Sequence, residues 1–127
     1  MHPQAEKVQQ ALQAAGCAAQ VREMPDSTRT AVEAAQAVGS TVGQIVKSLV
    51  FVLDPPGQPI LVLVSGSNRV NEAALGVRLG GALRKADATL VQQATGYVIG
   101  GVPPLAHASP LPTCHDSRFP ARVAATR

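Results

Sequence analysis

Hydrophobic and polar positions alternate with a helical period in two segments near the start of the chain. Apolar residues recur every three or four positions between Pro3 and Gly16, which predicts an amphipathic helix of about three turns ending at the glycine. Thr30 and Glu33 have the spacing of a capping box, and Gly39 is a typical left-handed stop. A second, short helix is therefore predicted between Thr30 and Gly39.

A different pattern, rich in valine and other β-favouring residues, predicts strands. The strongest candidates are residues 46–53 and 60–64, which flank the turn sequence Asp54-Pro55-Pro56-Gly57 and are expected to form a hairpin of two largely buried strands. Residues 18–23 are predicted as a short strand that the turn signal of residues 24–27 closes. Residues 82–84 are a further short candidate.

Helical patterning returns in the second half of the chain. Residues 70–79 are predicted as a helix with Asn71 as a cap, and residues 87–95 as a short helix that Gly96 stops. No repeat or linker interrupts the chain, so residues 1–127 are predicted to form one domain. We expect an α/β fold with a mixed, mostly antiparallel central sheet flanked by short helices.

Composition limits the class of protein. At 127 residues and 13.1 kDa, with 46% hydrophobic and 15% charged residues, the chain matches a packed globular domain and not a disordered segment. No apolar run approaches the roughly 20 residues that cross a bilayer, and no secretory signal pattern opens the chain. We therefore expect a cytoplasmic protein without membrane contact.

Positive charge is concentrated in the second half of the chain. Residues 55–127 carry seven basic and three acidic side chains, and Arg69, Arg78, Arg84 and Lys85 lie close together in sequence. They could face a polyanion or simply form a solvated rim. The chain has only three aromatic residues, so binding of single strands by base stacking is disfavoured. If the chain binds RNA, we expect it to contact the phosphates or one terminal nucleotide.

The familiar catalytic motifs are missing from the sequence. There is no GxSxG elbow, HExxH motif, phosphate-binding P-loop or GxGxxG loop. Cys17 and Cys114 are far apart, and the three histidines do not form a ligand pair, so we expect neither a metal site nor a structural disulfide. An enzyme of this sequence would work by positioning and backbone electrostatics, without a cofactor.

Two features could supply such chemistry. Lys47 interrupts an apolar strand, so its ammonium must reach an anion, a carbonyl or water, although a lysine on the solvent face of the strand is an open alternative. Gly100 and Gly101 can turn backbone N–H groups outward as an oxyanion hole, with Pro103 and Pro104 stiffening the loop; the alternative is a tight connection.

Four segments carry a resemblance to a known family: residues 30–35, 42–51, 64–70 and 95–104. Together they resemble the YbaK family of aminoacyl-tRNA deacylases, whose domain is also inserted in bacterial prolyl-tRNA synthetases as an editing module. The resemblance extends from about Glu6 to Asp116. Beyond that point relatives continue through a further strand and helix, whereas this chain is shortened or divergent up to Arg127.

The resemblance implies roles for particular residues. Lys47 would lie near the terminal adenosine and aminoacyl group, and the N–H groups of Gly100 and Gly101 would hold the ester carbonyl. Family analogy places the remaining candidates around the substrate, although each serine or threonine could equally be an ordinary turn or cap residue: Thr28, Thr30, Val46, Ser65, Gly66, Asn68 and Asp116.

The implied function is trans-editing: hydrolysis of the ester in a mischarged tRNA, most readily tRNA-Pro carrying alanine, cysteine or a similar small residue. Water attacks, or the thiol of a cysteine substrate, assisted by the ribose 2'-hydroxyl, so neither a protein nucleophile nor a metal is needed. The implied partners are the tRNA acceptor end and prolyl-tRNA synthetase, not DNA. The alternatives are a module of the same fold that binds an aminoacylated or nucleotide end without hydrolysis, and a structural partner of a synthetase.

Overall fold

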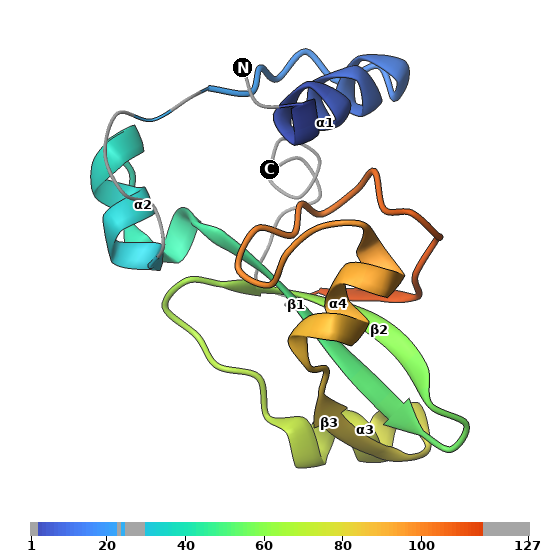
Figure 1. Cartoon of the computed structure of the whole chain (residues 1–127). Helices are drawn as coiled ribbons and strands as arrows, with labels where there is room; N and C mark the ends of the chain where they lie inside the picture. The colour runs from blue at the N-terminus through green and yellow to red at the C-terminus, as the bar shows by residue number, and fades with distance from the viewer. Residues whose placement is uncertain (1–2, 23, 25–29, 116–127) are drawn as a thin grey trace.

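A computed structural model describes residues 3–22, 24 and 30–115 of the chain. Within them the chain forms four helices, a short 3-10 turn and four strands (Figure 1). In chain order these are α1 (Pro3–Ala14), α2 (Ala31–Val38), η1 (Val42–Gln44), β1 (Val46–Asp54), β2 (Gln58–Ser65), α3 (Glu72–Leu79), β3 (Ala82–Lys85), α4 (Ala88–Thr95) and β4 (Thr113–His115).

The four strands form one sheet in the order β3-β1-β2-β4. β1 is antiparallel to both β2 and β3, whereas β2 and β4 are parallel, which confirms the predicted mixed, mostly antiparallel α/β fold. β1 is much longer than its neighbour β3, which pairs only with residues 51–54 of β1. The first half of β1 therefore has a strand on one side only.

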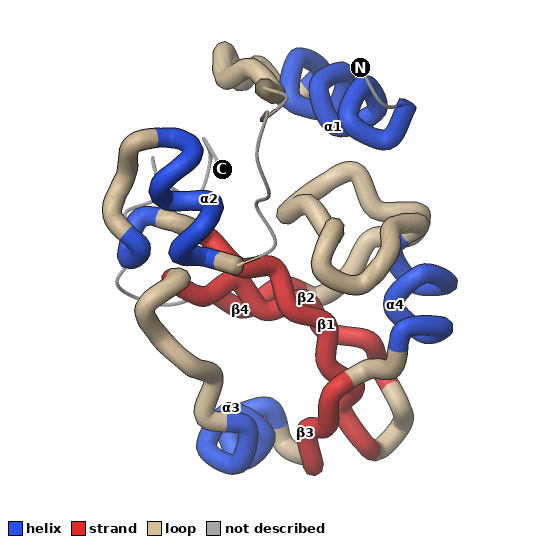
Figure 2. The backbone as a smooth tube through the Cα atoms, turned by 60° about the vertical axis from the view of Figure 1, so that its left-hand side comes forward, coloured by secondary structure: helices blue, strands red, loops and turns tan. Residues whose placement is uncertain are grey.

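Both faces of the sheet are covered. Side chains of a strand alternate between faces, and Val50, Val52 and Leu61 pack with Val91 of α4 on one face. Phe51, Ile60 and Val62 form the core of the other face, beneath Leu75 of α3. In Figure 2 α3 and α4 lie on opposite sides of the strands. Burial on both faces explains why the predicted hairpin strands are almost continuously apolar.

The predicted helix starts depend on capping side chains, and these are present. Thr30 Oγ accepts from Glu33 N at 3.1 Å and Glu33 Oε1 accepts from Thr30 N at 3.3 Å, which is the predicted capping box. Asn71 Oδ1 accepts from Ala74 N at 3.0 Å. Because Asn71 is the cap, α3 begins at Glu72, two residues later than predicted.

The predicted strand at residues 18–23 is wrong as far as the structure describes it, since residues 17–22 form no regular element. The backbone of this segment is bound instead by a side chain of α1. Gln9 Oε1 accepts from Val21 N at 2.6 Å, and Gln9 Nε2 donates to Ala19 O at 3.3 Å. One glutamine side chain thus takes the place of a neighbouring strand. Residues 23 and 25–27 of the predicted strand and turn lie outside the described residues.

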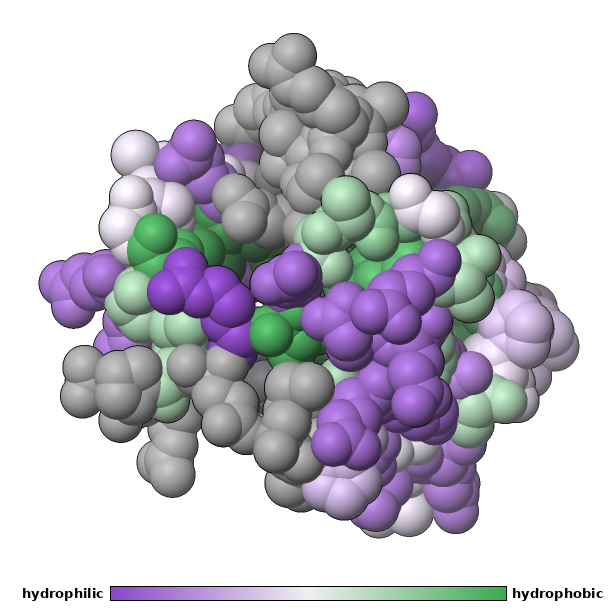
Figure 3. Space-filling view, turned by 90° about the horizontal axis from the view of Figure 1, so that it is seen from above, coloured by the Kyte–Doolittle hydropathy of each residue, from purple (hydrophilic) through white to green (hydrophobic). Residues whose placement is uncertain are grey.

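α1 lies away from the sheet, beside the loop that follows α4 (Figure 1). Gln4 Nε2 donates to Gly96 O at 3.2 Å, and Lys7 Nζ lies 5.1 Å from the ring centroid of Tyr97. Seen from above, hydrophilic residues gather over α1, as its amphipathic pattern predicts (Figure 3). None of the helices in the described residues has the length and apolar character needed to cross a membrane.

Candidate functional site

The unpaired half of β1 exposes main-chain groups at the edge of the sheet. Val50 O accepts from Ala86 N at 3.2 Å, on the side of β1 that faces β3. Because the main-chain groups of a strand alternate in direction, those of Ser48 and Val46 also point to this side, where β3 no longer reaches. The edge therefore offers backbone donors and acceptors to a ligand.

A cavity of about 320 Å³ lies along this open edge; we call it the edge cavity. It is bordered by the start of α2, by β1, and by the glycine loop after α4, so it gathers segments far apart in sequence. Its lining residues are Thr30, Ala31, Ala34, Ile45, Val46, Lys47, Ser48, Leu49, Gly100 and Val102. Lys47 is the only charged residue among them.

Lys47 is half-buried, and its ammonium has a defined partner. Lys47 shares the α3 face of β1 with Leu49 and Phe51, and its Nζ donates to Asn68 O at 2.7 Å. The sequence predicted that the ammonium would reach an anion, a carbonyl or water, and its partner is a carbonyl. The alternative, a lysine on the open solvent face of the strand, does not match a half-buried side chain. A charge-assisted bond of this length restricts the side chain to one geometry.

The turn that presents Asn68 O is tightly bonded. Ser65 is buried, and its Oγ donates to Gly43 O at 2.7 Å. Gly66 N donates to Ile45 O at 2.7 Å, and Asn68 N donates to Ser65 O at 3.0 Å. None of the three predicted residues Ser65, Gly66 and Asn68 lines the edge cavity. They form the turn whose carbonyl, Asn68 O, accepts from the Lys47 ammonium.

The glycine loop reaches the same cavity from the α4 face. Gly100 is exposed with φ +85°, and within the described part of the chain its N–H has no hydrogen-bond partner. The expectation for Gly101 needs correction, because its N–H donates to Val98 O at 2.9 Å and so closes the turn. Of the two glycines, only Gly100 therefore lines the cavity with an N–H that has no partner among the described residues.

The base of this loop is anchored by buried side chains. Thr95 Oγ1 donates to Val91 O at 2.7 Å and accepts from Tyr97 N at 3.1 Å. Tyr97 is 4% exposed, its hydroxyl donates to Ala106 O at 3.2 Å, and burial raises the pKa of its phenol. The loop tip is exposed, whereas its two ends are fixed.

The other predicted site residues divide into two groups. Thr30 and Val46 line the edge cavity, although the Thr30 hydroxyl is already engaged in the helix cap. Thr28 and Asp116 lie outside the described residues. The structure thus brings together Thr30, Val46, Lys47 and Gly100.

Sequence reasoning missed several lining residues, most clearly Ser48 and Leu49. A second cavity of about 260 Å³ adjoins the first and shares both of them, as well as Gly100 and Val102. The available signal was the unequal length of the strands predicted at residues 46–53 and 82–84. A long strand beside a short one leaves an open edge, and an open edge exposes its residues.

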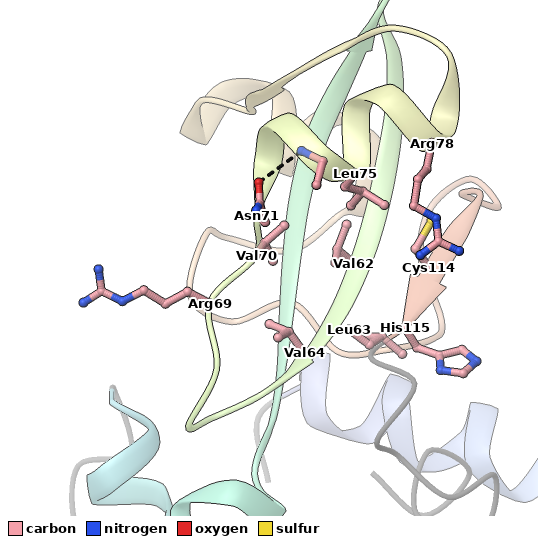
Figure 4. A pocket seen from close by; sticks show the side chains of 11 residues that line it. Val62, Leu63, Val64, Arg69, Val70, Asn71, Leu75, Arg78, Cys114 and His115 are labelled. Carbon is pink, nitrogen blue, oxygen red and sulfur yellow. Dashed lines mark hydrogen bonds between the residues drawn. The ribbon is translucent and has the colours of Figure 1, made fainter.

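A separate cavity of about 270 Å³ lies between α3, β2 and β4 (Figure 4). Arg78, Cys114 and His115 lie together on one of its sides, and Arg69 points away from it. No group of three histidine, cysteine or acidic residues within the described ranges could hold a metal ion. The single charge and the open N–H of the edge cavity make it the stronger candidate site, suited to a carbonyl or an anionic oxygen.

Comparison with known proteins agrees with this architecture. The model of the aminoacyl-tRNA editing domain matches residues 25–122, so the chain belongs to that family. The fold is YbaK-like, and the role of the family is aminoacyl-tRNA editing. No curated protein matches the chain.

Several solved structures are similar to this chain in sequence and in fold. A crystal structure of a candidate trans-editing enzyme for prolyl tRNA synthetase has 51% sequence identity and a TM-score of 0.85, over 91% of this chain and 73% of that one. A scaffold protein from computational epitope grafting has 48% identity and a TM-score of 0.84, with the same coverage. The hypothetical protein APE2540 has 35% identity and a TM-score of 0.74, over 86% of this chain and 71% of that one.

Proposed function

We propose that this chain is a trans-editing deacylase that hydrolyses the ester bond of mischarged aminoacyl-tRNA. The proposal rests above all on one observation: Lys47 and Gly100, from opposite faces of the sheet, line the same cavity. Strand alternation sends the Lys47 side chain to the α3 face, and the glycine loop lies on the α4 face. The two meet because the cavity follows the open edge of β1, where no strand separates the faces.

The chemistry requires stabilisation of one developing charge. Water adds to the ester carbonyl carbon, the bond from that carbon to the ribose oxygen breaks, and the ribose oxygen takes up a proton. Negative charge develops on the carbonyl oxygen, and we assign the N–H of Gly100 as its donor because Gly100 lines the cavity and this N–H has no partner among the described residues. The 2'-hydroxyl of the terminal ribose assists the attacking water, so the chain need not supply a nucleophile.

Lys47 supplies the positive charge of the site. Its Nζ donates one hydrogen bond to Asn68 O, which leaves two ammonium protons to donate to the ribose or phosphate oxygens of the terminal adenosine. Since no carboxylate lines the edge cavity, this charge is not neutralised there. The ammonium orients the ester with respect to the Gly100 N–H.

The proposed substrate is tRNA-Pro that carries a small residue such as alanine or cysteine. Two features support it: a similar solved structure is a candidate trans-editing enzyme for prolyl tRNA synthetase, and Ala31 and Ala34 of α2 border a cavity of only about 320 Å³. A synthetase pocket discriminates by only about 1–3 kcal/mol per methylene, so a second sieve is needed for small side chains. Prolyl-tRNA synthetase is the proposed partner.

Replacing Lys47 tests the proposal. We expect Lys47→Met to lower kcat/KM for amino-acid release from Ala-tRNA-Pro or Cys-tRNA-Pro by about 100-fold, the scale of one lost transition-state contact. Lys47→Arg should recover part of the loss because it keeps the charge. The measurement is release of labelled amino acid above the spontaneous rate, across a panel of mischarged tRNAs with EDTA present.

Arg78→Met is the matched control, because Arg78 is an exposed cation that lines the cavity between α3, β2 and β4. It should leave kcat/KM unchanged.

The Lys47 variant should remain folded. Loss of the Lys47–Asn68 bond costs about 2 kcal/mol of stability, which leaves a domain of ordinary stability folded. Binding of aminoacyl-tRNA without release of the amino acid would instead identify a non-catalytic module.

A further inference from the structure

A third cavity beside β1 collects positive charge. It has a volume of about 390 Å³ and lies on the α3 side of the strand, so we call it the α3-side cavity. It shares Lys47 and Leu49 with the edge cavity, and so continues it. Its lining includes Arg69 and Lys85 in addition to Lys47, and one carboxylate, that of Glu72. Three cations and one anion leave a surplus of two positive charges.

The strand register brings these cations together. Lys85 is paired with Phe51 and therefore lies on the same face as Phe51 and Lys47. Arg84, one position earlier, points to the opposite face and forms an ion pair with Asp54, with Nε 2.8 Å from Oδ2. Of two adjacent basic residues, only Lys85 can thus serve this cavity.

Arg69 reaches the cavity from the loop between β2 and α3. Arg69 also lines the cavity that contains Arg78 and Cys114, but in Figure 4 its side chain points away from that cavity. It is exposed, and it lines the α3-side cavity with Lys47. The four basic residues that sequence proximity grouped as one face therefore divide: Arg69 and Lys85 lie beside Lys47, whereas Arg78 and Arg84 do not.

Base stacking is not available at this surface. Phe51, which borders the cavity, is 2% exposed, and Tyr97 is 4% exposed. No other phenylalanine, tyrosine or tryptophan occurs among the described residues. A nucleic acid strand at this cavity must therefore be held by its phosphates.

We propose that the α3-side cavity binds the phosphodiester groups immediately before the terminal adenosine of the acceptor end, through Arg69 and Lys85. This rests on the proposed function, since it is the substrate's terminal ester that occupies the edge cavity. The continuity of the two cavities through Lys47 gives the single strand one path, with its phosphates in the α3-side cavity and its 3' end in the edge cavity. Arg69 and Lys85 are positioning residues and not catalytic ones.

The test uses a four-nucleotide RNA that ends in CCA, and the same RNA with neutral methylphosphonate linkages. Each phosphate contact to a single strand adds about 0.7 to the slope of log affinity against log salt. We expect the double variant Arg69→Gln/Lys85→Gln to reduce this slope by about 1.4. The double variant Arg78→Gln/Arg84→Gln removes the same net charge from other surfaces and should preserve the slope.

Glu72→Gln should tighten binding of the charged RNA about threefold, because it removes the one anion of the cavity.

The results separate this inference from the proposed function. The phosphate site would be overturned if the two double variants had equal slopes of log affinity against log salt. It would also be overturned if the wild type bound the neutral RNA as tightly as the charged RNA. Both outcomes count whether or not the protein hydrolyses an ester. If hydrolysis occurs, Arg69→Gln/Lys85→Gln should raise KM for aminoacyl-tRNA with kcat nearly unchanged, and should not affect hydrolysis of an aminoacyl-adenosine, which has no such phosphates. A fall in kcat on both substrates would contradict the assigned role.

Discussion

Two loops position the candidate groups of the site, Lys47 and Gly100, and they are held in opposite ways. The turn at residues 65–68 is bonded at nearly every position, and a Cβ at Gly66 would lie 2.5 Å from Val42 O and 2.9 Å from Ala31 Cβ. The glycine loop at residues 98–101 has an exposed tip, where a Cβ at Gly100 would meet no atom within 4 Å. Close packing fixes the first loop throughout, whereas the second is bonded at its base and by the Gly101 N–H, and only its tip at Gly100 lacks packing contacts.

The difference matches the proposed tasks of the loops. Lys47 must be held at one position, and the turn behind it supplies an acceptor that is itself immobilised by Ser65 and Gly66. Gly100 must leave its N–H open to a substrate, which a fully bonded loop would not permit. Substitutions in the turn should therefore act mainly on stability, and substitutions at the loop tip mainly on hydrolysis.

Gly66→Ala should have the largest effect on stability. The added methyl group overlaps a backbone oxygen, which cannot move aside as a flexible side chain would. We expect a loss of about 3 kcal/mol in the free energy of unfolding, at the upper end of ordinary overpacking. Urea denaturation measures it. A loss below about 0.5 kcal/mol would show that the turn is not closely packed.

Gly100→Ala should have a smaller effect on stability and a larger one on activity. At φ +85° an alanine is strained by about 1–2 kcal/mol, but it meets no neighbouring atom. If the strain is relieved by turning the peptide, the N–H leaves its position, and kcat should fall about 100-fold.

Gly101→Ala is the control for the glycine loop. Its φ is not positive, and its Cβ would lie 3.4 Å from Val98 Cγ2, an ordinary contact. Both stability and kcat should stay close to wild type, as at a surface position. Comparable losses of kcat for the two glycine variants would assign the loop a steric role in place of a hydrogen-bonding one.

Local signals predicted the elements well, and failed where a distant side chain decides the outcome. The capping box at Thr30, the cap at Asn71 and the stop at Gly96 each depend on neighbours in sequence, and all three are present. The missed case is the segment at residues 17–22, whose hydrogen bonds go to Gln9. Alternation in a short apolar stretch cannot reveal such a partner.

The site was predictable only in part for the same reason. Lys47 stood out because a charge in an apolar strand needs a partner, but its partner, Asn68 O, is 21 positions away. The role of Gly101 was mispredicted because a glycine pair does not show which N–H closes the turn. The edge cavity depends on β3 being shorter than β1, which shapes the site without any chemical motif.

Tyr97 allows a last and smallest test, of the anchor behind the glycine loop. Burial raises the pKa of its phenol, so the folded state keeps the proton to higher pH than the unfolded state, whose pKa is about 10. The stability that this group contributes is complete below pH about 10 and is lost as the pH rises through the raised value, by at most about 1.4 kcal/mol per pH unit.

Tyr97→Phe should cost about 1 kcal/mol at pH 8, through the lost bond to Ala106 O. Because phenylalanine does not titrate, the difference from wild type in the free energy of unfolding should narrow above pH about 10. A difference that stays constant with pH would mean that the phenol is not desolvated and that the base of the loop is open to water.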